Sequence, residues 1–116
     1  IVVKVTQLLS SPEQSGPGVL NSNQPSDGHP RVSVLSVMGT ADRVIPYEGG
    51  SSSVFSGDDN FLLMPALTSM EVWASHDGCD LTPAVTNHTT DMGDSTAQKY
   101  TYGGCQDGTI VEHYGI

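Results

Sequence analysis

The run VSVLSVM at residues 32–38, followed directly by GTAD, constrains the fold of this chain more than any other stretch. Five of its seven residues are apolar and they fall on both faces of an extended chain, as in a strand between two covering layers. Gly39 and the small or polar residues after it then end the strand. We therefore expect a buried strand over 32–38, with Asp42 just beyond its carboxyl end.

A helix of about three turns is expected after residue 64. Pro65 suits the first helical position, where the missing N–H costs nothing, and Gly78 suits the left-handed residue just past a helix end. Spacings of three and four then give an apolar stripe, formed by Ala66, Met70, Trp73 and Ala74. This stripe predicts a helix that covers a sheet.

Two more strands are expected near the carboxyl end, AQKYTY at 97–102 and TIVEHYGI at 109–116, paired across a glycine-containing loop. Residues 1–9 favour a short strand or a frayed segment. Polar residues, glycine and proline predict loops over 10–30, 43–60 and 80–96, and the chain has 13 Gly and 7 Pro in all. The order of elements favours an α/β fold with a mixed sheet and a covering helix.

The charge balance restricts the partners. Four Lys and Arg stand against 13 Asp and Glu, a net charge of −9, which is the wrong sign for phosphate backbones or anionic lipid surfaces. No apolar stretch approaches the ~20 residues that span a bilayer. The opening IVVKV lacks the features of a signal peptide and is expected to begin within a strand, as in a trimmed piece. We expect neither nucleic acid nor membrane as a partner.

Cys79 and Cys105 are the two cysteines, and neither lies in a CxxC pair that would suggest zinc or redox chemistry. They form either a disulfide or two buried thiols. A disulfide would indicate an oxidising compartment such as the periplasm or the outside of the cell. Asn87 opens an NHT sequence, the acceptor pattern for N-glycosylation, which matters only in a eukaryotic source.

Three segments together resemble one enzyme family. They are MGTADRVIPYEGG at 38–50, VWASHDGC at 72–79, and GGC at 103–105 with the GTIVEHYGI that follows. This combination is similar to the esterases that include polyhydroxybutyrate depolymerases and feruloyl or acetylxylan esterases, which are secreted serine hydrolases of the α/β-hydrolase fold. The resemblance implies that residues 32–116 are the carboxyl-terminal part of such a domain, and that 1–31 are a loop-rich lead-in from its preceding part.

The same resemblance implies roles for single residues. Asp42 would be the acid of the Ser-Asp-His triad, the helix with Trp73 would pack on the sheet, and Cys79 would pair with Cys105. The VIPY segment after Asp42 supplies candidates for the acyl pocket, namely Val44, Ile45 and Tyr47. The implied reaction cleaves carboxylic esters through an acyl-serine intermediate, without a metal or an organic cofactor.

The other two triad members are not expected in this chain. A G-x-S-x-G elbow should precede the acid, whereas GDSTA at 93–97 follows it, so Ser95 is not expected to be the nucleophile. The base should follow the last strand. The four histidines are instead interpreted as surface or strand residues (His29, His76, His88 and His113). The chain alone is therefore expected to be inactive.

A different class of function starts from the acidic loops. Oxygen-rich loops can bind calcium, and the candidate ligands are Asp58, Asp59, Asp77, Asp80, Asp91 and Asp94, although no run matches an EF-hand loop. Solvated acidic loops are the simpler interpretation. The alternative function is thus a secreted, disulfide-bonded binding module, with or without calcium, that has no catalysis. The sequence leaves the ester substrate and the oligomeric state open.

Overall fold

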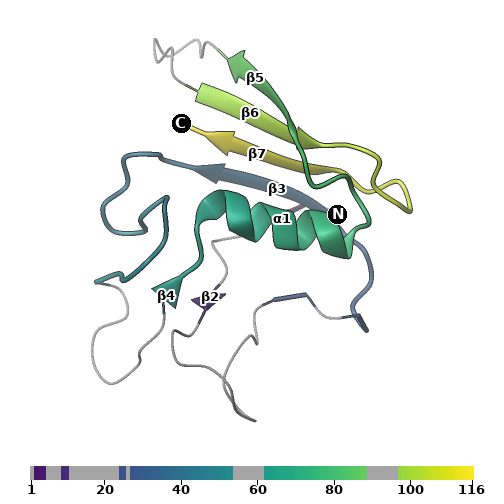
Figure 1. Ribbon diagram of the computed structural model, residues 1–116, viewed down its shortest axis with the longest axis horizontal. Coiled ribbons are helices and arrows are strands. Elements are labelled where there is room, and N and C mark those ends of the chain that lie inside the picture. Colours follow the sequence, from purple (N-terminus) through teal and green to yellow (C-terminus); the bar gives the residue numbers. More distant parts are fainter. Residues whose placement is uncertain (1, 5–8, 11–23, 26, 54–61, 89–96) are drawn as a thin grey trace.

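The computed structural model describes residues 2–4, 9–10, 24–25, 27–53, 62–88 and 97–116. These residues form a five-stranded mixed sheet with one helix packed against one face (Figure 1). The strands in their order across the sheet are β1 (Val2–Lys4), β3 (Ser33–Met38), β7 (Val111–Gly115), β6 (Ala97–Tyr102) and β5 (Ala84–His88). The expected α/β class, a mixed sheet with a covering helix, is confirmed.

The sheet has a parallel half and an antiparallel half. β1, β3 and β7 run parallel, and Val34 pairs with Val111 in the register between β3 and β7. β6 and β5 then continue the sheet in antiparallel order. The carboxyl ends of β3 and β7 therefore meet at the same edge, which is where open α/β sheets commonly bind ligands.

Helix α1 (Ala66–His76) begins and ends close to the predicted positions. Pro65 is the N-cap residue, one position outside the helix, and the first helical amide of Ala66 donates to the Tyr47 carbonyl at 2.9 Å. At the other end Gly78 has a φ of 71°, and the amide of Cys79 donates to the Ala74 carbonyl at 2.8 Å. This is the glycine-terminated helix end that the sequence predicts.

The core lies between α1 and one face of the sheet. The predicted stripe is confirmed, because Met70 and Ala74 are buried and Trp73 packs beside them. They contact inward-facing residues of three strands, Val34, Val111 and Tyr102. On the opposite face of β3 Val37 stays 44% exposed, so the described residues do not form the second covering layer expected over 32–38.

The loop expected over 80–96 is wrong in part, because β5 occupies residues 84–88 within it. β5 is an edge strand that pairs with β6 through its backbone, and its residues 84–87, including Asn87, are exposed. An exposed edge strand needs no apolar alternation, so the sequence carried no strand signal here. A second, two-stranded sheet of β2 (Leu9–Ser10) and β4 (Leu62–Leu63) was also not predicted.

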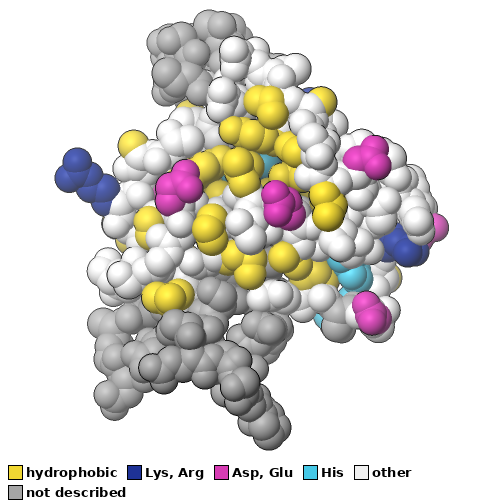
Figure 2. All heavy atoms as spheres, viewed as in Figure 1, with side chains coloured by type: hydrophobic (Ala, Val, Ile, Leu, Met, Phe, Trp, Pro, Cys, Tyr) yellow, Lys and Arg dark blue, Asp and Glu magenta, His cyan; other side chains and the backbone are white. Residues whose placement is uncertain are grey.

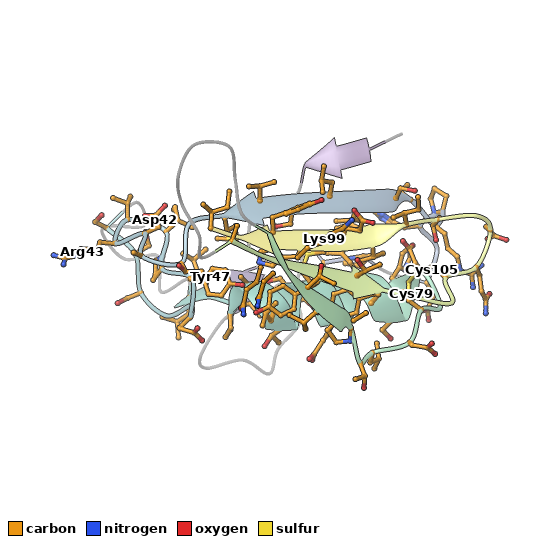
Figure 3. The ribbon with its side chains drawn as sticks, turned by 90° about the horizontal axis from the view of Figure 1, so that it is seen from above. Asp42, Arg43, Tyr47, Cys79, Lys99 and Cys105 are labelled. Carbon is orange, nitrogen blue, oxygen red and sulfur yellow. A yellow bond between two sulfur atoms is a disulfide. The ribbon has the colours of Figure 1, made fainter. Side chains whose placement is uncertain are left out.

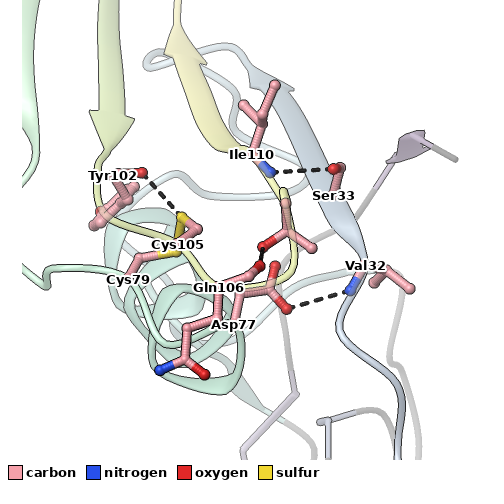
Figure 4. The surroundings of a disulfide bond; sticks show 9 residues. Val32, Ser33, Asp77, Cys79, Tyr102, Cys105, Gln106 and Ile110 are labelled. Atoms are coloured by element: carbon pink, nitrogen blue, oxygen red, sulfur yellow. Dashed lines mark hydrogen bonds between the residues drawn. A yellow bond between two sulfur atoms is a disulfide. The ribbon is translucent and has the colours of Figure 1, made fainter.

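A disulfide joins Cys79 to Cys105, and their Cα atoms lie 3.9 Å apart. It fastens the end of α1 to the loop between β6 and β7 (Figure 4). Backbone hydrogen bonds close the same junction, since the Gln106 amide donates to the Asp77 carbonyl at 2.9 Å and the Asp80 amide donates to the Gly103 carbonyl at 2.8 Å. The expected pairing of the two cysteines is confirmed.

Among the described residues, no helix combines the length and the apolar character that crossing a membrane requires. A disulfide is compatible with an extracellular location.

Candidate functional site

The GTAD turn lies where β3 and β7 end together. The Thr40 amide donates to the Ile116 carbonyl at 2.8 Å, and the Ile116 amide donates to the Met38 carbonyl at 2.9 Å. These bonds continue the parallel pairing beyond the strands. Asp42 therefore stands at the carboxyl edge of two parallel strands, at the end of the sheet away from the disulfide (Figure 3).

The Asp42 carboxylate is exposed and is held by its own loop. Its Oδ1 atom accepts hydrogen bonds from the backbone amides of Val44 at 2.8 Å and Ile45 at 3.0 Å. The Ile45 and Val44 amides lower the pKa of Asp42 below its ordinary value, because they stabilise the charged form. Within the part of the chain that the structure describes, Oδ2 accepts no hydrogen bond. Asp42 is thus an ionised, oriented carboxylate with one oxygen available to a partner.

Tyr47 is buried rather than lining an open pocket. Its ring reaches under the end of the sheet, only 8% exposed, and its hydroxyl lies 2.8 Å from His113 Nε2. The other ring nitrogen, His113 Nδ1, lies 3.0 Å from the Ser36 hydroxyl oxygen. We call these three residues, Tyr47, His113 and Ser36, the buried polar chain.

Burial controls the ionisation of the buried polar chain. It lowers the pKa of His113 to about 4 and raises the pKa of Tyr47, because both charged forms lose their hydration. His113 has no exposed surface and Ser36 is 3% exposed. Ser36 and His113 are hydrogen-bonded to each other, but both are buried, so an ester could not reach them. This pair is therefore not interpreted as the serine nucleophile and histidine base of the triad.

Val44 and Ile45 differ from Tyr47 in their surroundings. The Val44 side chain is 53% exposed and Ile45 is half-buried, beside Asp42 on the outside of the loop. The Ser52 hydroxyl donates to the Val44 carbonyl at 2.5 Å and steadies this part of the loop. Both side chains stay candidates for contact with an acyl group, whereas Tyr47 belongs to the core.

The remaining histidines lie away from Asp42 or outside the described side chains. His76 is in the last turn of α1, and its Nε2 lies 3.2 Å from the Pro30 carbonyl oxygen. His29 is exposed in the loop before β3, and the two histidines line one open pocket of about 800 Å³ at the amino-terminal end of that strand. The side chain of His88 and the whole of Ser95 lie outside the described residues.

The acidic residues do not form a cation site in the described part of the chain, where no group of three or more His, Cys, Asp and Glu could hold a metal ion. Acidic side chains are scattered over the face seen in Figure 2. Asp80 is exposed, as expected for a loop. Four of the candidate calcium ligands lie outside the described residues, namely Asp58, Asp59, Asp91 and Asp94.

Asp77 corrects the expectation of solvated acidic loops. It follows α1 directly and is fully buried, and its Oδ1 accepts a hydrogen bond from the Val32 amide at 3.3 Å (Figure 4). Among the residues that the structure describes, its Oδ2 has no hydrogen-bond partner, and the Thr109 hydroxyl donates to the Gln106 carbonyl at 2.8 Å. Burial raises the pKa of Asp77. The folded helix end encloses this carboxylate, which a polar sequence context does not reveal.

The buried polar chain was not anticipated as a unit. Its signal was present in the sequence, because alternation along 111–115 places His113 on the same face as the buried Val111. What the sequence could not supply was the partner, since Tyr47 comes from a loop 66 residues away. Comparison of the chain with family models, with curated proteins and with solved structures gave no match.

Proposed function

We propose that this chain is the acid-bearing, carboxyl-terminal part of a secreted serine hydrolase that cleaves carboxylic ester bonds. The observation that supports the proposal best is the state of Asp42. Its Oδ1 is engaged by two backbone amides while Oδ2 stays available at the carboxyl edge of β3 and β7. The resemblance of residues 32–116 to the polyhydroxybutyrate depolymerase and feruloyl esterase family assigns the triad acid to this same residue.

The proposed role follows from charge and geometry. A triad aspartate accepts a hydrogen bond from histidine Nδ1–H, which fixes the ring tautomer and stabilises the imidazolium formed when serine gives up its proton. Asp42 suits this role, because the Ile45 and Val44 amides favour its ionised form and Oδ2 accepts no hydrogen bond from the described residues. Oδ2 is the atom that would accept the histidine proton.

The edge of the sheet supports the same role. The Ile116 carbonyl accepts a hydrogen bond from the amide of Thr40, which lies two residues before Asp42. A histidine in a loop that follows Ile116 would leave from this edge and would need only a short connection to reach Asp42. The chain order Asp before His is the order that α/β-hydrolases use, with the serine upstream of both.

The substrate class proposed is an ester, either a polyester such as a polyhydroxyalkanoate or a feruloylated or acetylated polysaccharide. The reaction forms and then hydrolyses an acyl-serine, and it needs no metal or organic cofactor. The disulfide supports the secreted or periplasmic location proposed here, since such bonds persist in oxidising compartments.

The proposal is tested by Asp42→Asn in the full hydrolase, with Asp80→Asn as the control because Asp80 is also exposed but lies at the disulfide end. We expect Asp42→Asn to keep the fold and to lower kcat by up to about 10⁴-fold, because the histidine then takes the wrong tautomer. Asp80→Asn should leave kcat near normal. A folded Asp42→Asn variant with normal kcat would refute the assignment of Asp42 as the triad acid. A full-length protein that hydrolyses no ester would instead favour the non-catalytic binding module.

A further inference from the structure

The loop that carries Asp42 is fastened at its far end by one residue. Tyr47 inserts its ring under the sheet, where the hydroxyl is hydrogen-bonded to His113 and the ring packs against the imidazole with centroids 5.6 Å apart. Its backbone carbonyl accepts the first amide of α1. Tyr47 therefore ties the loop to the strand β7 through its side chain and to the helix through its backbone.

The space around the Tyr47 hydroxyl is closed by Gly115 on β7. A Cβ atom at Gly115 would lie 3.0 Å from the tyrosine oxygen and 3.3 Å from Thr40 Cγ2. Both contacts are tighter than ordinary van der Waals distances, so a side chain there would push against both ends of the Asp42 loop. Because Gly115 has no side chain, the Tyr47 hydroxyl can approach β7 closely.

The backbone donors that hold Asp42 lie close to Tyr47 in the chain. The Val44 and Ile45 amides lie between Asp42 and Tyr47 in the chain, and both point at Asp42 Oδ1. Two residues later the chain must enter the core as Tyr47. If the ring leaves its seat, the two amides lose their fixed direction, and Oδ1 and Oδ2 become interchangeable.

We propose that Tyr47 is a positioning residue, which orients the Asp42 carboxylate through its buried hydrogen bond to His113, and not a residue that contacts substrate. The inference rests on the proposed function for its catalytic meaning, because it assigns a role in that same site. It replaces the expectation that Tyr47 lines the acyl pocket. The structural part of the proposal is that Tyr47 fixes the hydrogen bonds of Asp42. This part does not depend on any reaction.

The structural content is tested in the 116-residue chain with Tyr47→Phe, which removes only the hydroxyl, and with Gly115→Ala, which crowds it. Tyr102→Phe is the matched control, because Tyr102 is also buried but lies on β6 in the core near the disulfide. The readouts are the pKa of the Asp42 carboxyl, followed by carbon NMR, and the hydrogen exchange of the Val44 and Ile45 amides. The pKa of Asp42 in the folded state does not depend on overall stability alone.

We expect Tyr47→Phe and Gly115→Ala to raise the Asp42 pKa and to speed exchange of the two amides by about 10-fold, because the carboxylate loses oriented donors. Tyr102→Phe should change neither. An unchanged Asp42 pKa in folded Tyr47→Phe would overturn the proposal, and so would an equal shift in Tyr102→Phe. Should Gly115→Ala fail to fold, Tyr47→Phe still decides the matter.

In the full hydrolase, Tyr47→Phe should lower kcat by about 10-fold with KM changed less than about twofold, since positioning acts on the reacting state more than on substrate binding. An increase in KM with normal kcat would instead make Tyr47 a substrate contact and overturn the proposal. The two failures are distinguishable. If Asp42→Asn leaves kcat normal, Asp42 is not the triad acid, while the pKa result for Tyr47→Phe still stands.

Discussion

His113 is a histidine with no exposed surface, in the strand at the centre of the sheet. Its two ring nitrogens are hydrogen-bonded to Ser36 and Tyr47, which satisfies a neutral ring. Because burial disfavours the imidazolium, the cost of protonating this ring falls on the folded state alone. His113 should therefore make the fold sensitive to acid, while the raised pKa of Asp77 acts in the opposite direction.

We predict that the free energy of unfolding falls as the pH drops from about 6.5 to about 4. In that range the unfolded chain takes up a proton on His113 that the folded chain does not, because the folded pKa is about 4 against an ordinary 6.5. The loss reaches about 3 kcal/mol for this residue, and above pH 6.5 its contribution is constant. Urea unfolding at several pH values measures it.

The control for this pH dependence is a substitution of an exposed histidine. His113→Asn should flatten the slope between pH 6.5 and 4 even though it lowers stability at neutral pH. His29→Asn should leave the slope as it is, since His29 is exposed. An identical slope in the wild type and in folded His113→Asn would assign the acid sensitivity to other groups.

The elements differ in how well they could be predicted. β3, α1, β6 and β7 carry apolar periodicity because each buries a face, and these are the elements that the sequence located. β5 buries no described side chain and is held by backbone pairing with β6. Its side chains therefore carry no periodicity from which a strand could be predicted. The position of Asp42 followed from the strand before it. The buried positions of Tyr47 and Asp77 depend on contacts between segments distant in the sequence. Periodicity within one segment cannot predict such contacts.

The disulfide links two of these elements, and its removal should weaken their junction. It closes a separation of 26 residues between α1 and the loop before β7. In the chain-entropy description a loop of this size contributes roughly 3 kcal/mol to stability. We predict that the double variant Cys79→Ala/Cys105→Ala loses about that much in urea unfolding.

A titration checks the bond itself in solution. The unfolded, unreduced chain should show no free thiol, and reduction should release both. Two free thiols before reduction would contradict the bond. Ser33→Ala, which removes the hydroxyl that accepts the Ile110 amide near the same junction, gives a smaller loss for comparison.

The proposed catalytic residue and the disulfide lie at opposite ends of the sheet. Asp42 stands at the carboxyl edge of β3 and β7, while Cys79 and Cys105 close the opposite end of the sheet (Figure 3). The described residues present an oriented carboxylate at this edge. Besides this acid, the proposed reaction would need a serine nucleophile and a histidine base.

We predict that the 116-residue chain alone shows only background hydrolysis of a p-nitrophenyl ester. An oriented carboxylate without a catalytic serine and a catalytic histidine forms no acyl intermediate. Ser95 lies outside the described residues, and Ser95→Ala is the variant that checks it. Turnover by the chain that disappears in Ser95→Ala would contradict both this prediction and the interpretation of GDSTA as a loop.

The proposed contact between Asp42 and a catalytic histidine is testable by proton NMR of the full-length protein, independently of turnover. A histidine Nδ1–H that donates to a carboxylate gives a resonance far downfield of ordinary amide protons. We predict such a resonance in the wild type and in Asp80→Asn, and its loss in Asp42→Asn. A downfield resonance that persists in folded Asp42→Asn would show that another group holds the histidine, and Asp42 would then not be the acid.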